Sequence, residues 1–250
     1  SGIIIMKTEQ ILKDIFKLDD EQINEFIDLA TSLDLTLDPF LNGVVFKPKS
    51  NDPAPYSEDV QKHIIVMELR HIFRSHFAGI TSNKQKEYIG NPGAPGSAKN
   101  TFIEAMLRTG AINPTSHVYI DPDHTVLRSM RSYHEKAGLN NENGENAYEF
   151  YRDASNYIAN FLLVWAIWKG YSVVHGATAT AERIKTHIYP TLVKRNYAIK
   201  LHVHWADEAD REVWMNHYQL ERKFMHFNRA GDKFKVAPVF ERLFDAFIPY

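Results

Sequence analysis

The chain has 250 residues, of which 44% are hydrophobic and 24% are charged. This composition is that of a globular protein and excludes a disordered, collagenous or coiled-coil chain. The sequence contains no cysteine, which excludes a disulfide scaffold, a cysteine nucleophile and cysteine-ligated metal sites. The longest apolar stretch, residues 158–168, is shorter than the ~20 residues that span a bilayer. We therefore expect a soluble, cytoplasmic protein that does not bind membranes.

The net charge of −2 conceals an uneven distribution along the chain. Residues 1–60 contain 5 basic and 12 acidic residues, whereas residues 183–250 contain 12 basic and 8 acidic residues. The near-neutral total disfavours nucleic acid as a partner, because such proteins need a basic surface. Any anion is expected to bind to the basic C-terminal part, although two solvated surfaces of unlike charge would give the same counts.

The first 80 residues have helical patterns. Apolar side chains recur at helical spacing over residues 7–32, with acidic residues between them, which predicts one or two amphipathic helices. Residues 47–55 include three prolines and are typical of a linker, and a second helical stretch follows over about residues 57–77. We expect residues 1–80 to form a mostly helical N-terminal segment of undisclosed function.

From residue 84 the pattern changes to alternating strands and helices. Short apolar runs predict strands at 88–89, 117–120, 171–174 and 198–205. Helical patterns occupy about 99–109, 145–169, 180–195 and 207–226. This alternation predicts an α/β domain with a mainly parallel sheet over residues 81–250. In such sheets ligands bind at the carboxyl ends of the strands.

A loop rich in glycine and proline follows the first expected strand. Gly93 and Lys99 match the spacing of the phosphate-binding P-loop, G-x-x-x-x-G-K-[ST], between a strand and a helix. Backbone N–H groups and the helix N-terminus would bind a triphosphate there, with Lys99 reaching the β- and γ-phosphates. The predicted nucleotide-binding residues are Gly93, Ala94, Pro95, Gly96, Ser97, Ala98, Lys99, Asn100 and Thr101.

Two positions depart from the P-loop pattern. Ala98 replaces the last glycine, and Asn100 replaces the hydroxyl residue that binds Mg²⁺. The carbonyl of Asn100 and the hydroxyl of Thr101 are still ligand types that Mg²⁺ accepts. These departures leave two alternatives open: a glycine-rich turn that merely caps a helix, and a P-loop protein that binds nucleotide or a partner without catalysis.

Four motifs arrive in order along the chain. The P-loop is followed by Asp121-Pro122-Asp123 at the end of the second expected strand, by Gly170-Tyr171 with Gly176 and Thr178 around the third, and by a basic segment after the fourth. Over about residues 85–245 this order resembles the zeta toxin family of P-loop kinases. The resemblance implies a P-loop kinase-like parallel sheet flanked by helices.

The resemblance also implies an activity and its residues. Zeta toxins use ATP and Mg²⁺ to phosphorylate a sugar hydroxyl of UDP-N-acetylglucosamine. The family's base maps to Asp123, because an attacking hydroxyl must lose its proton. The cations of its lid map to Arg222 and Lys235, which would neutralise the transferring phosphoryl group. Lysine lacks the bidentate geometry of arginine. The alternatives are an aspartate that caps a strand-to-helix turn and a solvated basic helix face.

The acceptor is the least defined part of this hypothesis. The family has an acidic residue at the position of Asn160, whereas Thr178 matches, and Asp121 lies beside the expected base. We therefore predict only a nucleotide-sugar or nucleotide-like acceptor that contacts Asp121, Asn160 and Thr178. A polynucleotide 5′-hydroxyl kinase is an alternative that the net charge disfavours. The resemblance to toxins further implies a protein antitoxin or regulator as partner, and delivery into a target cell.

The histidines do not predict a metal site. His202 and His204 would lie on one face of a strand, but no further ligands occur at matching spacing. His175, at the end of the third expected strand, is expected to be hydrogen-bonded. The aromatic residues of the 145–169 helix follow helical spacing and are expected in the core.

Overall fold

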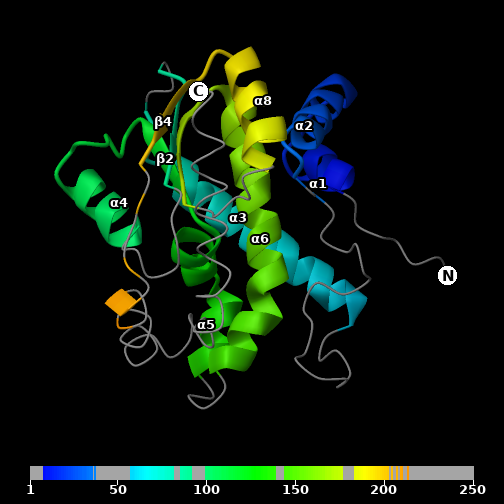
Figure 1. Cartoon of the computed structure of the whole chain (residues 1–250). Coiled ribbons are helices and arrows are strands. Elements are labelled where there is room, and N and C mark those ends of the chain that lie inside the picture. Colours follow the sequence, from blue (N-terminus) through cyan, green and yellow to red (C-terminus); the bar gives the residue numbers. More distant parts are fainter. Residues whose placement is uncertain are drawn as a thin grey trace.

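The structure is a computed structural model that describes residues 8–35, 37, 57–81, 85–91, 99–138, 144–176, 183–202, 204, 207, 209, 210 and 213. Within these ranges four parallel strands form one sheet flanked by helices, as predicted for an α/β fold (Figure 1). The strands are β1 (Glu87–Gly90), β2 (His117–Ile120), β3 (Ser172–His175) and β4 (Ala198–Leu201), in the order β2-β3-β1-β4.

The order of the strands locates the ligand-binding edge. From β1 the chain passes beyond β3 to reach β2, and from β3 it passes beyond β1 to reach β4 on the opposite side. The connections therefore diverge between β1 and β3, where doubly wound sheets bind ligands. In the pairing register Gly90 lies opposite His175, and His175 lies opposite Ile120, so these three strands end at one level.

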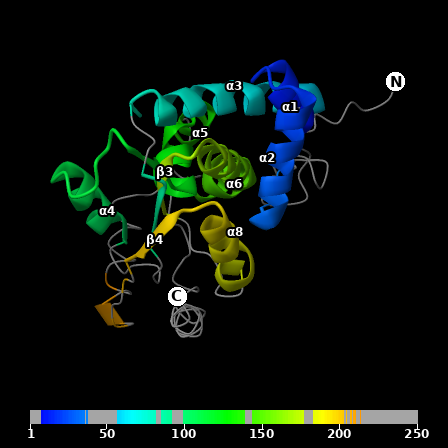
Figure 2. The ribbon, with the colours of Figure 1, turned by 90° about the horizontal axis from the view of Figure 1, so that it is seen from above.

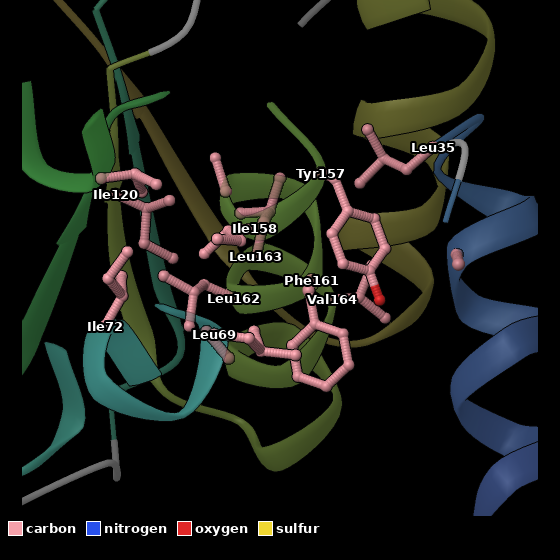
Figure 3. Packing of buried hydrophobic residues seen from close by; sticks show 14 of the residues in the cluster. Leu35, Leu69, Ile72, Ile120, Tyr157, Ile158, Phe161, Leu162, Leu163 and Val164 are labelled. Carbon is pink, nitrogen blue, oxygen red and sulfur yellow. The ribbon is translucent and has the colours of Figure 1, made fainter. Parts of the chain in front are cut away.

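Most helices cover one face of the sheet and share one core. The long helix α6 (Gly144–Lys169) packs on β2 and β3. Around it lie α1 (Thr8–Asp14), α2 (Asp20–Ser32), α3 (Glu58–Phe77), α5 (Arg131–Gly138) and α8 (Tyr189–Lys194). Figure 3 shows how Leu69 and Ile72 of α3, Ile120 of β2 and Leu162 of α6 meet in this core.

Within the described ranges, one helix covers the other face. Figure 2 shows α4 (Lys99–Arg108) on the side of the sheet opposite α6 and α2. Ile103 of α4 packs with Ile89 of β1 and Val174 of β3 in a second, smaller buried cluster. The helix that follows the expected phosphate loop is therefore held against the central strands.

The N-terminal helices are joined to the rest of the fold by aromatic packing. Phe26 of α2 is fully buried, with its ring 5.2 Å from that of Phe161 and 5.9 Å from that of Trp168. Tyr157 and Phe161, predicted as core residues, are buried, and Trp168 is partly buried. Residues before position 80 thus share one core with α6, and the domain boundary at residue 80 stays a prediction.

One predicted helix is divided. The expected helix 180–195 is instead a π-helical turn, η4 (Ile184–Ile188), followed by α8, which has Pro190 in its first turn. Proline lacks an N–H and clashes with the preceding turn, so a continuous α-helix cannot pass through this position. β4 ends at Leu201, and most of the expected helix 207–226 lies outside the described residues. In the ranges described, no helix is both long and apolar enough to cross a membrane.

Candidate active site

Three strand ends bring polar groups to the carboxyl edge of the sheet. Asn91 follows β1, Asp121 follows β2 and Gly176 follows β3. The backbone N–H of Gly176 donates to the carbonyl of Ile120 at 2.9 Å, so the pairing of β2 with β3 continues to the last residue. These three residues therefore surround the divergence point of the strand connections.

Asp121 shapes the turn that leaves β2. Its Oδ1 atom accepts hydrogen bonds from the backbone N–H groups of Asp123 and His124, each at 2.9 Å. It thereby caps a π-helical turn, η1 (Pro122–Val126), which continues into a 3₁₀ turn, η2 (Leu127–Ser129). The interpretation of Asp-Pro-Asp as a capped turn is confirmed for Asp121. It does not compete with a site, because π-turns are frequent at functional sites.

The buried carboxyl of Asp121 titrates unusually. Burial, and less strongly the charge of Asp123, raise its pKa, whereas the two backbone N–H groups and Lys99 lower it, and the net result is a pKa of about 6. Asp121 is only 4% exposed. The carboxylate also abuts β3, since a Cβ atom added at Gly176 would lie 2.8 Å from Asp121 Cγ. Only glycine leaves room for the aspartate at this position.

Asp123 faces the N-terminal part of α6. The hydroxyl of Tyr148 lies 3.4 and 3.5 Å from the two carboxylate oxygens of Asp123, to which it can donate one long hydrogen bond. Tyr133 is buried nearby, and burial, followed by the charge of Asp123, raises its pKa. The guanidinium of Arg152 lies 5.9 Å above the Tyr148 ring. Asp123 is thus surrounded by phenol groups and is half-buried.

The start of α4 meets the end of β2. The side chain of Asn100 contacts Nε2 of His124, and the Tyr119 hydroxyl donates to Asn100 Oδ1 at 3.4 Å. The charge of Lys99 is close enough to lower the pKa of Asp121. Although β3 separates β1 from β2 in the sheet, the phosphate-loop helix and the Asp121–Asp123 turn therefore lie together.

His175 is a buried part of this edge. Its Nδ1 atom lies 2.7 Å from the Tyr88 hydroxyl of β1, which confirms the prediction that His175 is hydrogen-bonded. Burial, with a smaller effect of Arg183, lowers the pKa of His175 to about 4. The ring is therefore neutral at physiological pH and links β3 to β1.

The structure brings together four of the predicted site residues: Lys99, Asn100, Asp121 and Asp123. Thr101 follows on α4 and is exposed. Asn160 lies in the middle of α6, twelve residues after Tyr148, which corresponds to about 18 Å along the helix axis. It does not join the others, and its substrate role stays a prediction. The remaining predicted residues lie outside the described ranges: Gly93, Ala94, Pro95, Gly96, Ser97, Ala98, Thr178, Arg222 and Lys235.

Tyr148, His124 and the role of Gly176 were not predicted from the sequence. Tyr148 carries the same helical spacing as the core aromatic residues, and nothing in that spacing distinguishes it. Asn91 was not predicted either: it is 2% exposed, and among the described residues neither its amide oxygen nor its amide nitrogen has a partner. A buried amide without partners is rare and indicates a site completed by a further group.

The donor groups at this edge fit a magnesium ion. Mg²⁺ binds hard oxygen ligands and is usually held by one or two carboxylates together with substrate phosphates. Asp121, Asp123, the carbonyl of Asn100 and the hydroxyl of Thr101 supply such oxygens. Over the described residues no group of three or more histidine and acidic side chains is arranged to hold a metal by protein ligands alone.

His202 and His204 have an aromatic neighbour instead of a metal cluster. The ring of Phe102, on α4, lies 5.1 Å from the His202 ring and 4.8 Å from the His204 ring. Burial, followed by the charge of Lys99, lowers the pKa of His204. Packing against Phe102 therefore accounts for the two histidines at positions 202 and 204.

Comparisons with known proteins agree with this geometry. No curated protein sequence matches the chain significantly. A protein solved in a study of the PezAT chromosomal toxin–antitoxin system of Streptococcus pneumoniae is similar in fold, with a TM-score of 0.53 and 18% sequence identity over 76% of this chain and 72% of that one. The sequence model described as zeta toxin matches residues 76–211, more than half of the chain. With its parallel sheet and the acidic turn beside the phosphate-loop helix, the chain belongs to the zeta toxin family.

Proposed function

We propose that this chain transfers the γ-phosphate of ATP to a hydroxyl group of a nucleotide-sugar or nucleotide-like small molecule. The observation that carries the proposal is the convergence of Lys99 and Asn100 with the Asp121–Asp123 turn at the carboxyl ends of β1 and β2. The family is one of P-loop kinases, which supports phosphoryl transfer in general. We assign the reaction to residues 81–250.

Each step of the transfer has a candidate group. The carboxylate of Asp123 takes the proton from the acceptor hydroxyl, and the oxygen forms a bond to the γ-phosphorus. The bond from that phosphorus to the β,γ-bridging oxygen breaks, and ADP leaves with the electron pair. Lys99 and the loop 93–101 hold the triphosphate, while Arg222 and Lys235 neutralise the transferred group. Mg²⁺, when bound with ATP, supplies further neutralisation of the phosphate oxygens.

The contacts of the two aspartates support this division of roles. Asp121 uses Oδ1 to hold the turn, and its carboxylate packs against Gly176. The Tyr148 hydroxyl lies 3.4 and 3.5 Å from the two carboxylate oxygens of Asp123, a long contact that a closer donor such as an acceptor hydroxyl can replace. Asp121 and Thr178 then remain as proposed contacts of the acceptor molecule.

The test is a transfer assay with γ-labelled ATP, Mg²⁺ and a panel of nucleotide sugars, nucleotides and oligonucleotides. Asp123→Asn is expected to lower the transfer rate by 10²–10⁴-fold, which is the usual contribution of a general base. Lys99→Ala is expected to abolish transfer and weaken ATP binding. The controls are Asp153→Asn on the exposed face of α6 and Lys13→Ala at the end of α1, both exposed. Transfer by Asp123→Asn at the wild-type rate would remove this residue from the base role.

Binding without catalysis is the second candidate, and one observation favours it. The Asn100 side chain, at the position of the magnesium-binding hydroxyl, already contacts Tyr119 and His124. If those contacts block turnover, the double substitution Ala98→Gly with Asn100→Thr raises nucleotide affinity or creates transfer activity. An unchanged affinity and rate in the double variant would count against it.

A protein antitoxin is the partner we propose for this site. The support is the toxin–antitoxin system to which the structurally similar protein belongs. Competition between a candidate antitoxin and ATP for the wild-type chain would test this.

A further inference from the structure

Helix α3 makes polar contacts with the segment that carries the candidate base. The segment runs from Asp121 through η1 and η2 to Ser132 at the start of α5. Two polar side chains of α3 reach it: His76 contacts Thr125 in η1, and Glu68 contacts Ser132. They are eight residues apart, about 12 Å along the helix, and belong to one helical stripe.

The contact of His76 continues into Asp121. Nδ1 of His76 lies 2.8 Å from the carbonyl of Ile72, which can only accept, so this nitrogen carries a proton. Burial lowers the pKa of His76, with the Ile72 carbonyl acting in the opposite direction, so the ring is neutral near pH 7. Nε2 must then accept from the Thr125 hydroxyl at 2.9 Å.

Thr125 transmits this contact to the backbone of the base turn. Its Oγ1 atom accepts from the N–H of Asp121 at 2.9 Å, and its own N–H donates to the Asp121 carbonyl at 3.1 Å. The result is a chain of donors and acceptors from Asp121 through Thr125 and His76 to Ile72 in α3. The Thr125 hydroxyl has one proton and two possible acceptors, Nε2 of His76 and the Asp121 carbonyl at 3.0 Å. Donation to the carbonyl would take the hydroxyl proton away from Nε2 of His76.

Glu68 holds the other end of the segment. Its carboxylate accepts from the Ser132 backbone N–H at 3.0 Å, the Ser132 hydroxyl at 3.1 Å and the Arg131 N–H at 3.3 Å. The side chain is 1% exposed. A carboxylate at the start of a helix satisfies N–H groups that have no partner within the helix and interacts favourably with its dipole. The segment 121–132 is therefore fixed to α3 at both ends.

We propose that α3 is a polar brace that positions the Asp121–Asp123 turn, with His76 as its positioning residue and Glu68 as its second anchor. Most of α3 precedes residue 76, where the zeta toxin match begins, so the brace gives the N-terminal segment a role in the reaction. The part of the inference that concerns catalysis rests on the proposed function. Apolar contacts alone would hold α3 in the core, whereas buried polar contacts fix a particular geometry.

The experiment compares variants of the two ends of the His76–Thr125 contact. His76→Phe keeps a ring of similar size without nitrogen, Thr125→Val keeps the shape without the hydroxyl, and Thr125→Ser keeps the hydroxyl. His63→Phe is the matched control, because His63 is an exposed histidine on the same helix. For each variant we would measure turnover, the KM for ATP and hydrogen exchange at the amides of Asp123 and His124, which donate to Asp121 Oδ1.

His76→Phe and Thr125→Val are expected to lower turnover by about 10- to 100-fold, the effect of a small misplacement of a reacting group. The KM for ATP should stay within about twofold, because α4, which carries Lys99 and Asn100, is held by Ile103 against β1 and β3. Exchange at the Asp123 and His124 amides should become at least about tenfold faster in both variants. Thr125→Ser should behave as wild type, and His76→Phe with Thr125→Val together should cost little more than either alone.

The outcomes separate the brace from the proposed function. Faster amide exchange with unchanged turnover, or unchanged exchange in both variants, would overturn the brace as a positioning device. If His76→Phe fails to fold, Thr125→Val and Glu68→Gln test the same geometry, since the latter keeps an acceptor oxygen for Ser132. If the wild-type chain transfers no phosphate to any acceptor, the proposed function fails, and the exchange measurement alone still decides whether α3 holds the turn.

Discussion

Gly176→Ala tests the close approach of β3 to the carboxyl group of Asp121. A Cβ atom at this position would lie 2.8 Å from Asp121 Cγ and 2.9 Å from Asp121 Cβ, whereas ordinary contacts begin at 3.4 Å. The carboxylate oxygen Oδ2 of Asp121 would lie closer still, so one side of the contact must move by more than about 0.6 Å. Gly176 cannot retreat easily, because its N–H is bonded to the Ile120 carbonyl at 2.9 Å.

The contact between the new methyl group and Asp121 can reduce stability in two ways. If the site holds its geometry, the extra methyl group overpacks it, which costs about 1–3 kcal/mol. If the carboxylate moves instead, it weakens the hydrogen bonds from the Asp123 and His124 amides, and a bond to a charged group contributes about 1.5–3 kcal/mol. We expect Gly176→Ala to lower the free energy of unfolding by about 3 kcal/mol and the Tm by roughly 10 °C.

The assay is urea denaturation of Gly176→Ala beside Gly79→Ala. Gly79 is exposed, and a Cβ atom added there meets nothing within 4 Å, so this control should change stability by less than about 0.5 kcal/mol. In an Asp121→Gly background both the carboxyl group and the Cβ atom of residue 121 are gone, and Gly176→Ala should then cost less than about 1 kcal/mol. Equal stabilities of Gly176→Ala and Gly79→Ala would refute the account of this contact.

Three further predictions follow from buried groups. Because burial raises the pKa of Asp121 to about 6, the folded chain binds more protons than the unfolded one between about pH 4 and 6. The contribution of this group to stability therefore falls as pH rises. In urea denaturation the free energy of unfolding of Asp121→Asn should rise by about 3 kcal/mol relative to that of wild type between pH 4 and 8. The pKa of His175 is lowered to about 4, so the contribution of this group to stability rises with pH. The free energy of unfolding of His175→Gln should therefore fall by about 3 kcal/mol relative to that of wild type over the same pH range. A change of the same sign in both variants would contradict the assignment. Phe26→Ala should lower the free energy of unfolding by about 3–5 kcal/mol and keep one transition by circular dichroism and tryptophan fluorescence, whereas two separate transitions would show that the N-terminal helices fold independently of α6.

Much of the fold could be predicted from local sequence patterns. The apolar runs at 117–120 and 171–174 coincide with β2 and β3 to within one residue, and α6 begins one residue before its expected start. α6 is long and periodic, whereas β2 and β3 are short apolar runs that are buried along nearly their whole length, and both patterns can be recognised in the sequence. The division of the 180–195 helix could have been anticipated from Pro190, because proline in a helix interior removes a hydrogen bond.

The site could be predicted only where its residues form a motif along the chain. Lys99 and the Asp-Pro-Asp turn are such residues, and the structure brings them together. Tyr148 and His76 are different: their contacts join residues 25 and 49 positions apart, and both lie on helices whose apolar residues pack in the core. Helical periodicity identifies the buried face of a helix, but it does not say which polar atom on that face meets which partner.

The energetics of the carboxyl edge support placing the function there. Asp121, directly after β2, and His175, the last residue of β3, lie at the ends of neighbouring strands. Burial disfavours the charged form of each, so it raises the pKa of Asp121 and lowers the pKa of His175. Asn91, beside them, has no hydrogen-bond partner for either amide atom in the part of the chain that the structure describes. An apolar group at any of these positions would avoid the cost of burying a polar one. Perturbed and unsatisfied polar groups of this kind cluster at functional sites, which supports the proposal that this edge, and not the aromatic core around Phe26, carries the function.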